Sequence, residues 1–390
     1  MKKISSLIIV IVFSLCISIP LVMSITMSNS QVSKSEKRKL EPRPHLPVNT
    51  AELIDYPKLF DNYYSDNFGL RTSLLRYYKN IKFSIGDSPK DDSIIIGKDG
   101  WMFLGSIKHN IKKKFNDPIG YYRNVNKFTL IQLKHFAEYL TGLKTWLNKQ
   151  GIAYYFIIAP NKHTIYFDKL PNYIEKVNDF SATDQLIKYI RENTKVEIID
   201  LRNVLIKAKQ KNILYYKTGT HWNFKGGNVA QYEIMKIIQK KFPNSISPEM
   251  YADSIFKYKI ATDRWFEKQL GNFNLEKKAM APYPMFRSNK KTSSDYKKGK
   301  KGEDLGKIIH THNNANQQLS TVIFRDSFFR ILEPYFSRKF KRSTYIWQKL
   351  NLQLLKKYIR LDKPDIIIEE WVERDLLNIP ENYDVFSSLN

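Results

Sequence analysis

Cysteine is nearly absent from this sequence: Cys16 is the only one in 390 residues. It lies inside an apolar N-terminal run and lacks the small residue that a lipoprotein signal needs just before it. The rest of the chain therefore has no disulfide framework, no cysteine nucleophile and no thiolate metal site. His310 and His312 form an H-x-H pair without an apparent third ligand, so no metal is expected.

Glycine and acidic residues are also scarce. The 15 glycines form no phosphate-cradling loop and no nucleotide fingerprint, so no cofactor is expected. The 38 acidic residues face 64 Lys and Arg, which gives a net charge of +26. Such a charge favours an anionic partner, either nucleic acid, acidic phospholipid or an acidic polysaccharide, unless it reflects only a general richness in lysine. A hydrophobic content of 42% excludes a disordered tail and supplies a core.

The N-terminus determines which of these partners the chain can meet. Lys2 and Lys3 precede an uncharged apolar run over 4–27, longer than the ~20 residues that cross a bilayer. Basic residues on the N-terminal side place the rest of the chain outside the cytoplasmic membrane. No clear small-x-small cleavage site follows Pro20, so an uncleaved signal anchor over 1–27 is favoured over a removed signal peptide. Nucleic acid is then disfavoured, and the polymers and lipids of the envelope remain as partners.

Three regions are predicted along the chain: the anchor at 1–27, a stalk with a helical extension at 28–92, and an α/β domain at 93–390 with a basic insertion near 287–302. In the domain, helical and strand patterns alternate, and the apolar strands are nearly continuous. This pattern predicts a parallel sheet covered by helices on both faces, with its chemistry at the carboxyl ends of the strands. The predicted strands lie at 153–159, 196–200, 321–325 and 365–369, and helices at 128–147, 182–193 and 225–241.

Two polar residues at predicted strand ends or loops suggest a nucleophile and its base. Ser327 follows a buried strand and precedes a helical stretch, where its hydroxyl can project from the sheet edge toward an oxyanion site. An ordinary helix-capping serine fits the same position. His221 lies in a glycine-flanked loop before helix 225–241, where it can act as a base or simply bond its own loop. Together the two residues favour acyl transfer.

Five sequence blocks, in this order, resemble the SGNH-hydrolase-like domain of the AlgX/AlgJ alginate O-acetyltransferase family. The blocks are 97–104, 159–166, 216–223, 325–328 and 363–369, and residues 66–71 look like the N-terminal segment of that family. The resemblance covers roughly residues 36 to 378. It implies a three-layer α/β/α domain with a parallel sheet and a permuted motif order, in which the histidine block precedes the serine block.

The same resemblance implies that Ser327 is the nucleophile and His221 the base. The family usually has an aspartate two residues before the histidine, and here that position is Gly219. Three interpretations follow. Another carboxylate, with Asp326, Glu369 and Glu370 as candidates, orients the imidazole; a backbone carbonyl suffices; or the chain is inactive and only binds glycan.

Four further residues are candidate contacts for the oxyanion or the substrate. Asn161 follows strand 153–159, although Pro160-Asn161 is equally a turn. Arg325 stands two residues before the serine. Trp101 and Trp222 offer faces on which a sugar ring can stack, but a tryptophan belongs more often to the core.

The sequence thus predicts an O-acetyltransferase that modifies an anionic or neutral extracytoplasmic polysaccharide through an acetyl-serine. The family resemblance implies a multi-spanning membrane O-acyltransferase as acetyl donor. An acetyl esterase, or an inactive glycan-binding or scaffold subunit of an acetylation complex, are the alternatives. The domain would lie on the periplasmic side of the inner membrane, where the insertion at 287–302 would guide a polyanion.

Overall fold

The structure is a computed structural model that describes residues 2–26, 32–33, 38–84, 94–106, 117–261, 263, 266, 280–285, 308–313 and 318–379. The predicted basic insertion at 287–302 lies outside these residues. The chain divides into two compact units, which are described separately. One comprises Met1–Lys90 with Trp265–Leu275, and the other comprises Asp91–Arg264 with Glu276–Asn390.

The first unit is built mainly of helices. Helix α1 (Lys2–Thr26) includes Ser6–Ser24, a stretch long and apolar enough to cross a membrane by length and composition. The short strands β1 (Val32–Ser33) and β2 (Arg38–Lys39) pair antiparallel. Helices α2 (Thr50–Asn67) and α3 (Arg71–Ser84) follow, in the region predicted to hold a helical extension.

The second unit contains a sheet of six strands in the order β6-β5-β12-β10-β11-β9. All neighbours are parallel except β9, which pairs antiparallel with β11 at one edge. The strands are β5 (Ala153–Ala159), β6 (Ile198–Asp200), β9 (Ile308–His312), β10 (Ser320–Phe324), β11 (Arg342–Ile346) and β12 (Ile366–Val372). The parallel sheet predicted from the apolar runs is thereby confirmed.

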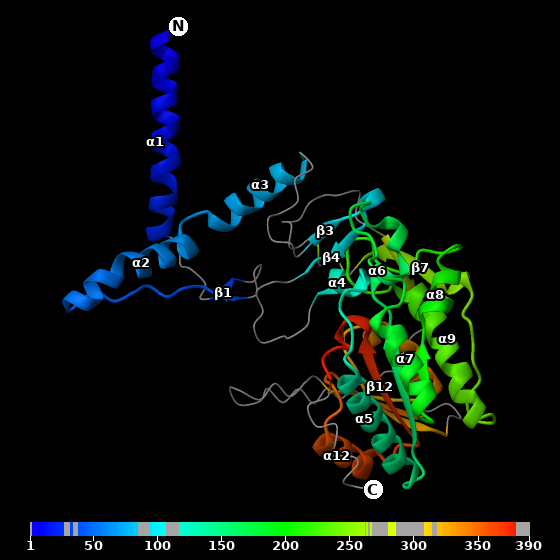
Figure 1. Ribbon diagram of the computed structural model, residues 1–390. Coiled ribbons are helices and arrows are strands. Elements are labelled where there is room, and N and C mark those ends of the chain that lie inside the picture. The colour runs from blue at the N-terminus through cyan, green and yellow to red at the C-terminus, as the bar shows by residue number, and fades with distance from the viewer. Residues whose placement is uncertain are drawn as a thin grey trace. The chain divides into compact units, whose positions relative to one another are not determined.

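Each strand of this sheet buries side chains on both faces, because successive residues point to opposite sides. In β5, Tyr155 and Ile157 belong to one apolar cluster, while Phe156 and Ile158 belong to the other. Helices α8 (Arg202–Ala208), α9 (Phe224–Lys241) and α11 (Glu333–Lys339) supply the first cluster. Helices α5 (Leu130–Asn148), α7 (Ala182–Asn193) and α12 (Leu352–Asp362) supply the second (Figure 1). The result is the predicted three-layer α/β/α fold.

Smaller elements complete the unit. The hairpin β3 (Ile94–Ile96) and β4 (Met102–Leu104) turns at Asp99, whose φ of 53° is left-handed. A second antiparallel pair, β7 (Phe256–Ile260) and β8 (Met280–Pro284), lies outside the main sheet. Short helices are α4 (Pro118–Tyr122), α6 (Lys162–Ile165) and the 3-10 turns Lys98–Gly100, Phe167–Lys169, Asp253–Ile255, Phe329–Ile331 and Glu373–Asp375.

Candidate active site

Ser327 lies in the turn that follows β10, at the carboxyl edge of the parallel strands. Its neighbour Asp326 fixes this turn with both carboxylate oxygens. One oxygen accepts the N–H of Phe328 at 2.7 Å, and the other accepts the N–H of Val372 at 2.8 Å. Because Val372 is the last residue of β12, the serine turn is tied to the end of the neighbouring strand. The 3-10 turn and α11 then begin, as the strand-to-helix prediction requires.

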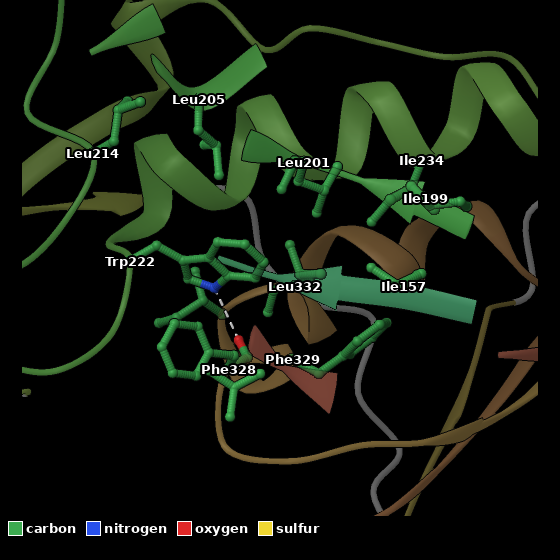
Figure 2. Close-up of a cluster of buried hydrophobic side chains, with 14 of the residues drawn as sticks. Ile157, Ile199, Leu201, Leu205, Leu214, Trp222, Ile234, Phe328, Phe329 and Leu332 are labelled. Atoms are coloured by element: carbon green, nitrogen blue, oxygen red, sulfur yellow. Dashed lines mark hydrogen bonds between the residues drawn. The ribbon is translucent and has the colours of Figure 1, made fainter. Parts of the chain in front are cut away.

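His221 lies in a loop closed by a bridge between Tyr215 and Trp222. Asn223 ends the loop and caps α9, since its side chain accepts the N–H groups of Lys225 and Gly226. The indole N–H of Trp222 donates to the carbonyl of Phe328 at 2.9 Å (Figure 2). The residue after the histidine is thus bonded to the residue after the serine, inside a buried cluster.

The two loops bring three side chains into one hydrogen-bonded chain, here named the Ser-His-Asp chain: Ser327, His221 and Asp263. His221 Nδ1 lies 2.7 Å from Asp263 Oδ2, and His221 Nε2 lies 2.7 Å from Ser327 Oγ. A carboxylate only accepts, so Nδ1 carries the ring proton and Nε2 is left to accept from the serine hydroxyl. This arrangement can remove a proton from Ser327 and stabilise the resulting imidazolium.

Asp263 holds the histidine loop as well as the ring. Its Oδ2 also accepts the N–H groups of Thr220 and His221, both at 3.0 Å. Burial opposes the charged carboxylate, but the hydrogen bond and charge of the His221 ring outweigh that effect, so the pKa of Asp263 is lowered. The side chain therefore stays ionised across the neutral range.

Gly219 leaves the space that Asp263 fills. A Cβ at Gly219 would lie 2.4 Å from both the backbone oxygen and the Oδ2 of Asp263. Residue 219, where the family resemblance places the acid, thus has no room for a side chain, because the carboxylate of Asp263 already fills that space.

Asp263 was not among the acids predicted from the sequence, and this is a correction. Asp326 and Glu370 form hydrogen bonds with backbone, and the N–H of Asp326 donates to Glu370 Oε2 at 3.0 Å. Burial and the neighbouring negative charge of Asp326 raise the pKa of Glu370 well above its usual value. Burial likewise raises the pKa of Asp326. Both residues brace the serine turn and have no hydrogen bond to the imidazole.

Glu369 is also used elsewhere. It accepts hydrogen bonds from the hydroxyls of Tyr139 and Tyr154 and from the indole N–H of Trp371. It is fully buried on the face of β12 that packs against α5. Because a carboxylate contacts Nδ1, the alternative in which a backbone carbonyl orients the ring also does not describe this site.

The tryptophans predicted to stack on sugar are core residues. Trp101 is 3% exposed and stacks on Tyr166 with ring centroids 4.1 Å apart. Trp222 is fully buried in the cluster of Figure 2. A third tryptophan, Trp371 of β12, is also a core residue, packed between Phe136 and Phe156. These three rings have no face open to a ligand.

Asn161 and Arg325 are likewise buried. Asn161 accepts a hydrogen bond from Arg374 at its Oδ1, 3.0 Å away, and its backbone N–H donates to Glu373. Arg325 forms an ion pair with Glu333 at 2.5 Å, and its Nη1 donates to the carbonyl of Asp326 at 3.0 Å. Both contacts hold structure near the site, and the 2% exposure of Arg325 leaves no surface for a substrate.

Lys162, which the sequence did not single out, anchors the histidine loop from below. Its buried Nζ donates to the carbonyls of Met102, Tyr216, Lys217 and Gly219 at 2.6–3.1 Å. Burial lowers the pKa of Lys162 well below its usual value, while the charge of Asp263 acts in the opposite direction. The ammonium group links β4 to the loop that presents His221.

No spacing rule points from His221 to Asp263, which lies 42 residues further along the chain. Asp263 follows β7 in a short polar stretch, and any such acid could be a surface residue. The available signal was indirect: a glycine where the acid was expected implies that an acid, if present, comes from another segment.

A three-layer α/β/α sheet with a serine and a histidine presented at its carboxyl edge defines an SGNH hydrolase-like domain. The family model described as "SGNH hydrolase-like domain, acetyltransferase AlgX" matches residues 94–259. This match and the curated relative agree with the resemblance to the AlgX/AlgJ acetyltransferase family that the sequence blocks carry. The matched residues include His221 but end before Asp263 and Ser327.

Among curated proteins, the chain is similar to the "Probable alginate O-acetylase AlgJ" of Pseudomonas syringae pv. tomato, with 23% identity over 199 residues. The match covers 50% of this chain and 46% of that relative, which is about half of its length. Among solved structures, Bacillus cereus PatB1 has 15% identity and a TM-score of 0.49, covering 73% of this chain and 96% of that one. The O-acetyltransferase domain of Pseudomonas putida AlgJ has 14% identity and a TM-score of 0.46, covering 76% and 99%.

Proposed function

We propose that this protein is an O-acetyltransferase that adds acetyl groups to hydroxyls of an extracytoplasmic polysaccharide through an acetyl-Ser327 intermediate. The observation that carries the proposal is the Ser-His-Asp chain, with 2.7 Å on each side of the His221 ring. The family-model match and the name of the curated relative support acetyl as the transferred group.

The reaction has two halves that use the same base. In the first, His221 Nε2 removes the proton of Ser327 while Oγ bonds the acetyl carbon, and the donor leaves with that proton. In the second, His221 removes a proton from a sugar hydroxyl, which attacks the acetyl-serine and releases Ser327 Oγ to be reprotonated. Asp263 keeps the ring in the productive tautomer and stabilises its positive charge in both halves.

The proposed location and partners follow from the N-terminal helix and the family resemblance. The apolar stretch Ser6–Ser24 would anchor the chain in the inner membrane, with the α/β unit on the periplasmic side. A multi-spanning membrane O-acyltransferase would supply acetyl groups. The net charge of +26 suits an anionic polymer such as the alginate named for the relative.

Mass spectrometry of the full-length protein tests the proposal. The protein in detergent is incubated with p-nitrophenyl acetate, and the peptide that contains Ser327 is examined for an acetyl group. We expect an adduct in the wild type and none in Ser327→Ala or His221→Ala. An unmodified wild type, together with Ser327→Ala cells that still acetylate their polysaccharide, would refute the proposal that the protein is an enzyme and would favour a glycan-binding subunit.

An added oligosaccharide separates transfer from hydrolysis. Acetyl recovered on the sugar supports the transferase, whereas release of free acetate alone, with every oligosaccharide offered, supports an acetyl esterase. The same Ser327, His221 and Asp263 serve both reactions, so only the fate of the acetyl group distinguishes them.

A further inference from the structure

Trp347 occupies the strand end next to the serine turn. It follows β11 directly, and β11 pairs in parallel with β10, whose last residue Phe324 is opposite Ile346. The backbone N–H of Arg325 donates to the carbonyl of Ile346 at 3.0 Å, so pairing continues to the residue before Trp347. Parallel strands end at one edge, which places Trp347 at the same edge as Ser327.

Trp347 differs from the other tryptophans of this edge in its exposure. It is 39% exposed, whereas Trp101, Trp222 and Trp371 are at most 3% exposed. Exposing a large apolar ring to water is unfavourable, so covering it with a ligand lowers the free energy. The ring therefore has surface available to a ligand, which the buried tryptophans lack.

Arg325 holds the ring in place from one side. Its guanidinium carbon lies 4.7 Å from the centroid of Trp347, within the range of a cation–π contact. The guanidinium is itself fixed by its ion pair with Glu333 and by the carbonyl of Asp326. A ring whose position is fixed before binding costs little conformational entropy when a ligand packs on it.

We infer that Trp347 forms an acceptor subsite, where a sugar ring of the polysaccharide packs its C–H face on the indole while a neighbouring hydroxyl reaches acetyl-Ser327. The inference rests on the proposed function. A pyranose matches the site because it combines an apolar face with a rim of hydroxyls, as the indole combines an apolar face with a polar edge. Trp347 is thus a binding residue for the second half-reaction and has no part in the first.

The test uses the full-length chain in its own cells and compares Trp347→Ala with Trp347→Phe. Two quantities are measured: the acetyl content of the extracellular polysaccharide and the fraction of Ser327 that carries acetyl. Loss of a stacking contact should lower polysaccharide acetylation about tenfold. The acetyl-Ser327 fraction should rise at the same time, because loading continues while the acceptor is held poorly. Phenylalanine should restore most of the transfer.

Trp146→Ala is the matched control. Trp146 is a half-buried tryptophan near the end of α5, which leads into the start of β5 at the opposite edge of the sheet. Both measured quantities should remain at the wild-type level in this variant.

The outcomes separate the subsite from the proposed function. A wild type whose Ser327 never carries acetyl refutes the proposed function and the subsite together. Acetyl-Ser327 in the wild type, with both quantities unchanged in Trp347→Ala, refutes the subsite alone. Loss of acetyl-Ser327 in Trp347→Ala also refutes it, because that result places the tryptophan in loading or in folding.

Discussion

Asp263 fills the space next to Gly219: a Cβ on the glycine would lie 2.4 Å from Asp263 Oδ2, the oxygen that accepts the Nδ1–H of His221. One oxygen of Asp263 also receives two backbone N–H groups of the histidine loop. The aspartate therefore occupies the place of a side chain that residue 219 of the loop would otherwise supply. Glycine at 219 and aspartate at 263 are two parts of one arrangement.

Gly219→Ala should disrupt this arrangement while leaving all three residues of the Ser-His-Asp chain present. The new methyl group overlaps both the backbone and the carboxylate of Asp263, so the acid must move away from the ring. We expect acetylation of Ser327 by p-nitrophenyl acetate to slow about 100-fold, because small displacements of catalytic groups are costly. Gly151→Ala is the control: its Cβ would meet nothing within 4 Å, and its φ of 74° strains an alanine without touching the site, so it should lower stability and keep the wild-type rate.

Asp263→Asn should slow the same reaction by about three to four orders of magnitude, the size of the effect when the triad aspartate of a serine protease is changed in this way. The amide can present an N–H to Nδ1, which moves the ring proton to Nε2, where it faces Ser327. Single-turnover mass spectrometry measures the rate. Asp168→Asn, an exposed acid that pairs with Lys209, is the control and should react normally.

A swap of the two positions adds a stricter test of the pairing between residues 219 and 263. Asp263→Gly alone should be as slow as Asp263→Asn. Adding Gly219→Asp to that variant returns a carboxylate to the position that the family resemblance indicates. The carboxylate of residue 263 is gone, but its backbone oxygen still lies 2.4 Å from the new Cβ, so this segment must shift to admit the side chain. We expect the double variant to react at least tenfold faster than Asp263→Gly. A double variant no faster than the single one would contradict the exchange.

The sequence predicted the layers and the strand ends well because those depend on local patterns. Apolar runs such as 153–159 became β5, and the residue order placed Ser327 after β10 as expected. The prediction of the orienting acid failed for a physical reason. Asp263 approaches His221 from beyond β7, outside the main sheet, and no pattern of hydrophobicity encodes that approach. The prediction that Trp222 stacks on a sugar also failed, because its ring is buried and its indole N–H donates to a backbone carbonyl inside the core.

Lys162→Met should destabilise the unit and loosen the histidine loop. Methionine keeps most of the volume, but the carbonyls of Met102, Tyr216 and Gly219 lose the ammonium donor, and Tyr216 keeps only the 3.4 Å bond from the N–H of Gly219. Leaving such buried acceptors without a partner costs about 3 kcal/mol in total. Urea unfolding followed by tryptophan fluorescence measures the loss. Lys209→Met, which removes a partly exposed lysine bonded to the carbonyl of Ile165, should cost less than about 1 kcal/mol.

Glu370 should make the unit less stable as the pH rises. Its pKa is raised well above the usual value by burial and by the charge of Asp326, so the folded state retains a proton that the unfolded chain loses above about pH 4.3. Unfolding then releases a proton, and the free energy of unfolding falls with increasing pH by up to about 1.4 kcal/mol per pH unit until the folded pKa is reached.

Glu370→Gln should flatten that slope, because the amide cannot titrate and its carbonyl can still accept the N–H of Asp326. Thermal unfolding between pH 5 and 8, followed by fluorescence, gives the slope for each variant. Glu192→Gln, an exposed position on α7, should leave it unchanged. A wild type whose unfolding temperature rises through this range would show that Glu370 is ionised in the folded state. It would then brace the serine turn as a carboxylate.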